Sequence, residues 1–577
     1  MPLRVAIVGS GVSGLAALWT LQQQQKQKQQ HDEEDEIETH LYEADDRVGG
    51  HTLTVPWRNL SKAGGVTMVD IAFTLYNKLT YLLTFSLYAW FRHKKMQTNP
   101  VYPSTHPANF TSLLSHLNIA SLPMRITFGL SRDNGQFEWS STSLSTFFAQ
   151  RRNLLSPSVW RMLFDIWRFN LFATDILHHN NNKYNPLNQN HNQNLKSQQK
   201  EEEEESVGSY LKRNNYSSTF RDNYLIPLAS SIWVNDPNQT LNSIPILMLV
   251  AYFKNHLLLN SSFGDDGVQW LVIKDGAKQY VDRILEGLPV GNLHVSTPIV
   301  KVESDCRVEG RGASLLLHTA DGSIERFDRV IVATAGDEAL RILGDGATDD
   351  ERRILGCFRT SPSRVFLHSD TSFMPRNRKA WSAWNYHDFS TSVPSGPHVS
   401  LTANLNDLPG QDISITGPIL TTLNPCRVPD PSSIQGTFYF RHPVYDSASM
   451  QAQNELHQIQ GRRGIWFAGA WMREGFHEQG FTAGVKAAMD IWPEVKLPFP
   501  IVDCPSPEEE RMKLSMEGHR LPGLMRLLRL STHAVQYSIV FGLLIGRVVM
   551  FLFGTIYSEY FVAARANARA KAKAKRV

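Results

Sequence analysis

The chain of 577 residues is too long for a single hydrophobic core, which predicts at least two domains with appendages. Its hydrophobic content of 42% and charged content of 20% are typical of a globular protein, and a net charge of only +3 gives no reason to expect a nucleic-acid partner. Its 4 cysteines are too widely scattered for a disulfide framework or a metal site. Because the first apolar run begins at residue 3, a cleavable signal peptide has no room, and we expect the N-terminal domain to face the cytosol.

A glycine motif follows directly after the first predicted strand. The apolar run Leu3–Val8 is typical of a buried parallel strand, and it leads through Gly9-Ser-Gly11-Val-Ser13-Gly14 into a helix-forming stretch. Gly9 permits a tight turn, Gly11 lets the backbone approach a pyrophosphate, and Gly14 lets the helix pack closely on the strand. Free N–H groups at the start of that helix favour a phosphate, so the pattern predicts a dinucleotide site.

A second predicted strand, Ile37–Tyr42, supports the same interpretation because it ends at an acidic residue. The carboxylate of Glu43 can accept the ribose hydroxyls of an adenosine. Glu43 lies 29 residues beyond Gly14, whereas about 20 are usual. We therefore interpret the Gln-rich and acidic stretch Gln22–Glu36 as an inserted, solvated loop.

The segment after Glu43 makes the prediction more specific. It contains Arg47-Val-Gly49-Gly50-His51-Thr52, and it resembles the E-A-x-x-R-x-G-G segment of the FAD-dependent amine oxidase and phytoene desaturase superfamily. The resemblance implies an α/β, Rossmann-like FAD-binding domain interleaved with an α+β substrate domain. It also implies that Arg47, Gly49 and Gly50 approach the FAD pyrophosphate and flavin, with His51 and Thr52 beside them.

Two later blocks extend the resemblance. The run Leu293–Val302 is predicted to form one strand, and the family places a backbone contact to the adenine at the Ile299 position. Near the end, a strand and turn at Gly469 lead into a helix whose small residues can approach a cofactor, with its N-terminal dipole directed at the flavin. In this block the resemblance implies cofactor contacts for Gly469, Glu478, Gly480 and Phe481.

The wording of that last block is closest to a subgroup of predicted NAD/FAD-binding, amine-oxidase-like proteins. Its plant relatives are fused to cyclopropane fatty-acid synthases. The subgroup has His-Glu-Asp-Gly where this chain has His-Glu-Gln479-Gly, so a role that rests on the Asp is not carried over.

The predicted domains follow from these blocks. The FAD-binding domain is expected from three segments, the substrate domain from the two segments between them, and appendages from the rest. The boundaries are 1–81, 269–345 and 461–495 for the FAD-binding domain, 107–268 and 346–460 for the substrate domain, 82–106 for an insertion, 178–205 for a disordered insert within the substrate domain, and 505–577 for a membrane-associating tail. The insertion is either a membrane-facing loop or a mistaken gene model. Within the substrate domain, Trp160, Phe164, Trp167 and Phe169 recur at helical spacing and are predicted to lie in the core or to line the substrate site.

The tail has its own hydrophobic helical pattern. Leu521–Leu530 is basic and amphipathic, as suits a membrane surface, and Ala534–Tyr557 is 24 residues long with a single charge, Arg547. Because a central Arg nearly offsets the gain from the apolar residues, the segment 534–557 is open to three interpretations. It could be a single span, an interfacial helix or a buried helix pair docked on the body. We expect the protein to be cytosol-facing and membrane-associated.

The expected chemistry is that of the cofactor, because no metal-ligand spacing or nucleophile triad competes with it. Trp466–Gly484 contains no cysteine that could bond the flavin, so FAD is expected to be bound non-covalently. His256, His477 and Tyr386 are the candidate catalytic residues, and Lys254 or Lys274 could hold a water near the flavin.

The predicted function is an FAD-dependent oxidoreductase that takes a hydride from an apolar, lipidic substrate. The lipid is suggested only by analogy with the relatives. The alternatives are a flavin amine oxidase, an isomerase that uses reduced FAD without net turnover, and a non-catalytic scaffold for a partner methyltransferase that modifies lipids.

Overall fold

The computed structural model describes residues 2–29, 37–59, 66–72, 76–77, 108–178, 205–256, 258–259, 270–305, 314–388 and 400–503, with Ser531 and Ser538 as single positions beyond them. The predicted insertion at 82–106 lies outside these ranges, as does the predicted tail at 505–577 apart from the two single positions, so both stay predictions. Within the described ranges, no helix combines the length and apolarity that crossing a bilayer requires.

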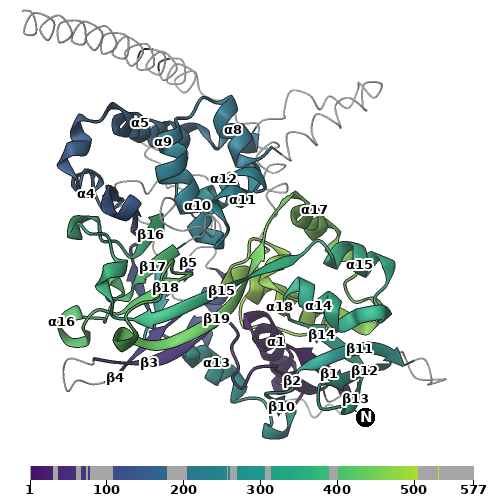
Figure 1. Ribbon diagram of the computed structural model, residues 1–577. Helices are drawn as coiled ribbons and strands as arrows, with labels where there is room; N and C mark the ends of the chain where they lie inside the picture. The colour runs from purple at the N-terminus through teal and green to yellow at the C-terminus, as the bar shows by residue number, and fades with distance from the viewer. Residues whose placement is uncertain are drawn as a thin grey trace, which may run out of the picture.

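A five-stranded parallel sheet forms the first half of the molecule, at the lower right of Figure 1. Its strand order is β10-β2-β1-β14-β20. The strands are β1 (Leu3–Val8), β2 (Ile37–Tyr42), β10 (Leu293–His294), β14 (Arg329–Val332) and β20 (Ile465–Phe467). Three distant parts of the chain therefore return to one sheet.

Helices and a second sheet cover the two faces of the parallel sheet. On one face α1 (Val12–Gln29), α13 (Lys278–Leu285) and α18 (His477–Ile491) lie over Val5 and Ile7. On the other face α14 (Gly336–Leu343), α15 (Asp349–Leu355) and the antiparallel strands β11 (Ile299–Asp305), β12 (Ser314–Thr319) and β13 (Ile324–Phe327) lie over Ala6 and Val8. Alternate residues of β1 thus enter different cores, which is why the strand is apolar throughout.

Two expectations for this half are wrong. The predicted single strand over 293–302 is two strands, because Pro298 lacks a backbone N–H and Ser296 has a φ of +52°. The Gln-rich stretch does not loop out at residue 22, because α1 continues to Gln29. Gln22 and Gln23 are buried, and the Gln22 amide donates to the Ile284 carbonyl at 3.0 Å. Glutamine has a good intrinsic helix propensity, which the composition argument overlooked.

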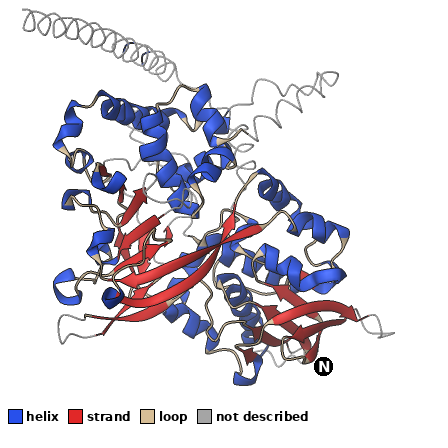
Figure 2. Ribbon diagram, in the orientation of Figure 1, coloured by secondary structure: helices blue, strands red, loops and turns tan. Residues whose placement is uncertain are grey.

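The second half is a seven-stranded mixed sheet with helices above it (Figures 1 and 2). Its strand order is β19-β15-β18-β17-β16-β7-β8. The strands are β7 (Phe128–Arg132), β8 (Phe137–Ser140), β15 (Arg359–His368), β16 (Trp384–Asp388), β17 (Ser400–Asn404), β18 (Leu420–Leu423) and β19 (Ile434–Val444). The long pair β15 and β19 extends toward the parallel sheet and links the halves.

The helices of this half share one apolar core with the strands β7 and β8. They are α4 (Leu144–Phe147), α5 (Pro157–Phe172), α6 (Asp175–His178), α8 (Val207–Arg213), α9 (Ser218–Phe220), α10 (Ile226–Trp233), α11 (Pro237–Asn242) and α12 (Ile246–Asn255). Every residue from Ile246 to Phe253 is buried, so α12 is the central helix. Smaller sheets pair β3 (Thr54–Arg58) with β4 (Val66–Asp70), and β9 (Trp270–Ile273) with β5 (Tyr76–Asn77) and β6 (Ser121–Met124).

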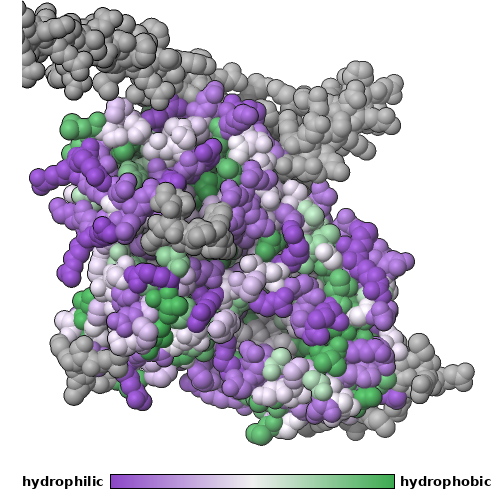
Figure 3. All heavy atoms as spheres, viewed as in Figure 1, coloured by the Kyte–Doolittle hydropathy of each residue, from purple (hydrophilic) through white to green (hydrophobic). Residues whose placement is uncertain are grey.

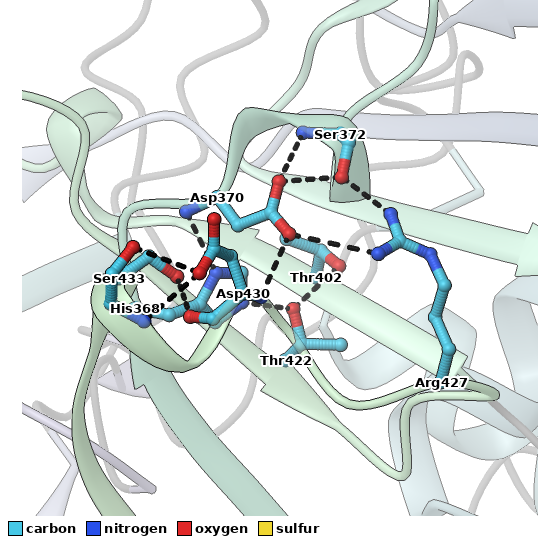
Figure 4. A network of polar contacts seen from close by, with 9 residues as sticks. His368, Asp370, Ser372, Thr402, Thr422, Arg427, Asp430 and Ser433 are labelled. Atoms are coloured by element: carbon cyan, nitrogen blue, oxygen red, sulfur yellow. Dashed lines mark hydrogen bonds and ion pairs between the residues drawn. The ribbon is translucent and has the colours of Figure 1, made fainter.

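A buried polar network fastens the seven-stranded sheet (Figure 4). His368 accepts the Asp370 N–H at Nδ1 (3.1 Å), which leaves Nε2 to donate to the Thr422 hydroxyl (2.7 Å). Asp370 also faces Arg427 across 3.7 Å. Burial keeps His368 neutral by lowering its pKa to about 4.

The aromatic residues predicted to lie in the core along α5 are only partly there. Phe169 is fully buried, but Trp160 and Trp167 are 49% and 46% exposed. The buried face of α5 is instead formed by Val159, Met162, Ile166 and Phe169. The prediction was wrong because α5 carries apolar residues on two faces, and helical spacing alone does not tell which of them packs inward.

Candidate active site

The turn between β1 and α1 has the geometry that the glycine motif predicts. Gly9 has a φ of +101°, and a Cβ there would lie 2.8 Å from the Ala333 carbonyl oxygen. A Cβ at Gly14 would overlap the Gly9 carbonyl oxygen. A Cβ at Gly11, in contrast, would meet no atom within 4 Å. The protein itself therefore requires Gly9 and Gly14, whereas Gly11 faces open space that a ligand can enter.

The start of α1 attracts anions. The helix has 18 residues and no acidic residue in its first turn, so its N-terminal N–H groups and dipole are not offset by a local carboxylate. Ser13 is buried there. Its hydroxyl oxygen lies 3.2 Å from a Cβ built on Gly480, and its carbonyl oxygen would overlap a Cβ on Gly484. Glycines on α18 thus let α1 and α18 meet at the turn between β1 and α1, which we call the dinucleotide turn.

Glu43 closes the other side of the turn. One carboxylate oxygen accepts the Ser10 N–H at 3.0 Å and the Ser10 hydroxyl, and the other accepts the Asp45 N–H at 3.0 Å. The Glu43 carbonyl accepts the Thr297 N–H at 2.8 Å, which brings the segment before Ile299 next to it. The Ile299 side chain is buried, so its backbone is the part that can face an adenine.

The loop with the second glycine pair packs on the first turn. The Gly49 N–H donates to the Ser10 carbonyl at 3.1 Å, and a Cβ at Gly50 would lie 3.0 Å from the Gly11 Cα. Arg47 Nη1 is buried and has no hydrogen-bond partner among the described residues. An unpaired guanidinium nitrogen in this position fits a pyrophosphate, since buried charged groups are normally paired.

His51 and Thr52 extend the site. The His51 ring is solvent-accessible, yet dense protein around it and the Arg47 charge lower its pKa to about 4. The two observations agree for a side chain that lines a recess. Thr52 is buried, and its hydroxyl lies 2.6 Å from the Tyr280 hydroxyl, which lies 2.8 Å from His477 Nε2. Burial lowers the pKa of His477 well below its ordinary value.

The residues predicted to contact the cofactor around Gly469 and α18 also hold other parts of the protein in place. A Cβ at Gly469 would overlap the Trp471 indole, whose Nε1 donates to the Thr334 carbonyl at 2.9 Å. Glu478 accepts the N–H groups of Asn109 (2.8 Å) and Phe110 (2.9 Å) and so caps α3 (Asn109–His116). Burial raises the pKa of Glu478 to about 7 against these hydrogen bonds. The Phe481 ring is buried 6.0 Å from that of Trp19, which leaves only its backbone to face a cofactor.

A second cluster precedes α18 and surrounds Glu474. Its carboxylate accepts from the Gln479 amide at 3.1 Å and lies 3.9 Å from His256 Nε2. Three buried atoms of the cluster have no hydrogen-bond partner among the described residues: His256 Nδ1, the Tyr445 hydroxyl and Gln479 Oε1. The Tyr252 ring lies 4.1 Å from His256 and 4.8 Å from Phe476.

The three predicted catalytic residues do not meet at one place. His256 belongs to the Glu474 cluster, and His477 belongs to the hydrogen-bonded chain with Tyr280. Tyr386 is buried in the core of the second half. Of the two lysine candidates, Lys274 is exposed.

Sequence reasoning missed Glu474, Tyr252, Tyr445 and Tyr280. Only Glu474 had a usable signal, since it lies three residues before the cofactor helix.

Comparisons with known proteins agree with this geometry. The sequence model of the family described as "Flavin containing amine oxidoreductase" matches residues 12–423. This chain belongs to that family. It is therefore a flavin-dependent oxidoreductase, and its cofactor is FAD, as predicted. The sequence matches none of the curated proteins with which it was compared.

Solved structures show the same fold at low sequence identity. Cyclohexylamine oxidase from Brevibacterium oxydans IH-35A aligns with a TM-score of 0.54 and 15% identity, over 85% of this chain and 99% of its own. Wild-type putrescine oxidase bound to putrescine aligns with a TM-score of 0.51 and 15% identity, over 86% and 100%. A CLA-producing fatty acid isomerase from P. acnes aligns less well, with a TM-score of 0.48 and 13% identity over 85% of this chain and 99% of its own.

The FAD of this family member fits the residues that surround the turn. Gly11, the start of α1 and Arg47 would hold its pyrophosphate, and Glu43 its ribose. When bound, FAD supplies the acceptor of a hydride. The chain supplies orientation, exclusion of water and any proton acceptor.

Proposed function

We propose that this flavin oxidoreductase oxidises an amine whose remaining surface is apolar, and that the Glu474 cluster binds the amino group. The observation that supports the proposal is a set of three buried atoms around one carboxylate that have no hydrogen-bond partner among the described residues. Buried polar atoms without partners are rare in proteins and usually mark a place for a ligand or ordered water.

The chemistry of the cluster matches an alkylammonium ion. The side chains of Glu474 and His256 are only 12% and 15% exposed, and a buried carboxylate is stabilised by every additional charged or hydrogen-bonding partner. An ammonium group offers three N–H donors. Glu474, Gln479 Oε1 and His256 Nδ1 would provide three acceptors. The aromatic rings of Tyr252 and Phe476 would add cation–π attraction at the same group.

The position of the cluster supports a role in catalysis. Glu474 and Phe476 immediately precede α18, whose Gly480 and Gly484 contact the dinucleotide turn. An amine gives up a hydride from its α-carbon readily only when its nitrogen is the neutral amine with a free lone pair, not the ammonium ion. In our proposal Glu474 orients the ammonium ion and His256 Nδ1 accepts its proton, and the C–H bond is then positioned for hydride loss. The chain thus provides binding, orientation and proton removal.

The test is anaerobic bleaching of the flavin band by primary alkylamines of increasing chain length. Glu474→Gln removes the charge and is expected to weaken amine binding at least tenfold, because a buried charge-assisted contact is lost. Glu494→Gln, at an exposed position just after α18, is the matched control and should bleach like the wild type. Equal amine dependence of the Glu474→Gln variant and the wild type would exclude the cluster as the amine site.

A lipid substrate is the second candidate. It is supported by the predicted membrane-associating tail at 534–557 and by the exposed aromatic residues Trp160 and Trp167 on α5. Both features would place the enzyme at a cytosolic membrane surface, within reach of acyl chains. Bleaching by unsaturated acyl lipids but not by amines would favour this candidate. Bleaching by neither, with FAD bound, would favour an isomerase or a scaffold for a lipid-modifying methyltransferase.

A further inference from the structure

Helix α5 differs from an ordinary surface helix because it buries three charged residues beside the apolar residues of its inner face. Its charged residues Arg161, Asp165 and Arg168 are buried, with 6%, 0% and 4% of their surface exposed. Asp165 lies 3.0 Å from Arg161 Nε and 3.2 Å from Arg168 Nη2, and it accepts the Ser217 N–H at 2.9 Å. The buried charges are thus held by ion pairs, whereas two tryptophans of the same helix face outward. A helix that faces water normally shows the opposite arrangement.

The outward tryptophans belong to a continuous apolar face. Trp160 donates from Nε1 to the Leu154 carbonyl at 2.9 Å, and its ring lies 5.0 Å from that of Phe148, next to α4. Phe164 and Trp167 continue the face along α5, with ring centres 5.9 Å apart. We define the α5 face by its apolar residues Leu144, Leu154, Leu155, Trp160, Phe164 and Trp167. Leu155 is 87% exposed, and hydrophobic residues are visible on the surface above α4 and α5 in Figure 3.

Basic residues surround the α5 face. Arg151 and Arg152 are exposed and lie three and two residues before Leu154. A second basic stretch lies against the loop after α4, because the Asn377 amide donates to the Ala149 carbonyl at 2.9 Å. This stretch contributes the exposed residues Arg376, Arg378 and Lys379. Between residues 134 and 172 the only carboxylates are Glu138 and Asp165, and both are buried.

We propose that the α5 face binds the surface of an anionic phospholipid membrane. Tryptophan is suited to the boundary between acyl chains and headgroups, because its ring is apolar and its N–H polar. Exposed leucines enter the acyl region, and the basic rim faces the anionic headgroups. A soluble acidic partner would match the rim but not the leucines and tryptophans at its centre. The proposal does not depend on the substrate of the enzyme.

The test measures burial of the face itself, so that binding through the predicted tail cannot imitate it. An environment-sensitive fluorophore is attached to Leu155→Cys in the full-length holoenzyme, and the signal of the identically treated wild type is subtracted. Val290→Cys is the control, since Val290 is 94% exposed in the other half of the molecule. With vesicles of phosphatidylcholine and phosphatidylserine, we expect a blue shift of the label at position 155, none at 290, and loss of the shift with phosphatidylcholine alone.

A double variant tests the same face without a label. Leu155→Asp with Trp167→Asp places two negative charges against the headgroups, whereas Val290→Asp with Ile415→Asp places them at exposed apolar positions elsewhere. We expect at least a fivefold lower bound fraction for the first pair in vesicle flotation and no change for the second. An unshifted label at position 155 on chains that do float would overturn the proposal. So would a dimeric wild type that the first pair renders monomeric, since a second copy would then cover the face.

Discussion

The dinucleotide turn and the Glu474 cluster use different parts of the chain for their contacts. Around the dinucleotide turn the contacts are made by backbone atoms, and glycines permit them at Gly9, Gly14 and Gly484. Around Glu474 the contacts are made by side chains from α12, from the end of β19 and from the segment before α18. A backbone contact requires a glycine at a fixed spacing, whereas a side-chain cluster requires only that distant residues meet. The dinucleotide turn is therefore constrained locally, whereas the Glu474 cluster, which joins side chains of both halves, depends on the fold.

Buried carboxylates and buried histidines differ in the direction in which burial shifts their pKa. Burial raises the pKa of Asp70 to about 6 and that of Glu478 to about 7 in the FAD-binding half. It lowers the pKa of His368 and of His387 to about 4 in the sheet of the other half. In each case burial disfavours the charged form. Because carboxylates and histidines are charged at opposite ends of the pH scale, a buried carboxyl such as Glu478 and a buried histidine such as His368 should respond to pH in opposite directions.

The largest effect is expected for Gly484→Ala. The new methyl group would overlap the Ser13 carbonyl oxygen, which is backbone and cannot rotate away, so α1 and α18 must separate. We expect a loss of about 3 kcal/mol in the free energy of unfolding, the upper end for overpacking, together with loss of FAD. Denaturant unfolding and the flavin absorbance of the purified protein measure both. Gly291→Ala, whose Cβ would meet no atom within 4 Å, should retain both properties.

Opposite pH responses of up to about 3 kcal/mol each are expected from Glu478 and His368, at about 1.4 kcal/mol per pKa unit. The raised pKa of Glu478 gives stability that is fully present below about pH 4.5 and is lost as pH rises through 7. The lowered pKa of His368 gives stability that is present above about pH 6.5 and is lost as pH falls toward 4. Urea unfolding from pH 4 to 8 is compared for the wild type, Glu478→Gln and His368→Gln.

The measured quantity is the pH dependence of each difference from the wild type, because both variants also lose hydrogen bonds at every pH. Glu478→Gln should gain stability relative to the wild type between pH 4.5 and 7. His368→Gln should gain it as pH falls from 6.5 to 4. If the stability difference from the wild type changed with pH in the same direction for both variants, burial would not shift the pKa values of Glu478 and His368 in opposite directions.

The sequence predicted the dinucleotide turn better than the Glu474 cluster, because backbone contacts require glycines at a fixed spacing and side-chain contacts do not. Gly9, Gly14 and Gly480 are placed by rules of backbone geometry, so the motif spacing was sufficient to locate them. Nothing in the spacing of Tyr252, Glu474 and Tyr445 indicates that they meet, because Glu474 lies 222 positions after Tyr252 and only the fold brings them together. The chain also has apolar residues on two faces of α5, and amphipathic periodicity could not tell which one is buried.

Removal of the Arg47 charge should weaken FAD binding by about 1.5–3 kcal/mol, or roughly 10- to 100-fold, the usual range for a hydrogen bond to a charged group. Arg47→Met keeps the length of the side chain but leaves the pyrophosphate without its buried donor. Fluorescence titration of the apoprotein with FAD gives the dissociation constant. Arg58→Met, at an exposed position in β3, is the control and should bind FAD normally. Unchanged affinity of Arg47→Met would mean that the backbone alone holds the phosphates.

The smallest effect is expected for Tyr280→Phe, which removes one link of a side-chain hydrogen-bond chain in the FAD-binding half. The Tyr280 hydroxyl joins Thr52 (2.6 Å) to His477 (2.8 Å), and its loss should cost about 1 kcal/mol of unfolding free energy, a typical net hydrogen bond. FAD affinity should change less than threefold, because the glycine contacts remain. Tyr439→Phe, 72% exposed on β19, should alter neither quantity. A loss of FAD affinity as large as that of Arg47→Met would show that side-chain positions, rather than backbone geometry, govern FAD binding at the dinucleotide turn. The contrast between the turn and the Glu474 cluster would then be wrong.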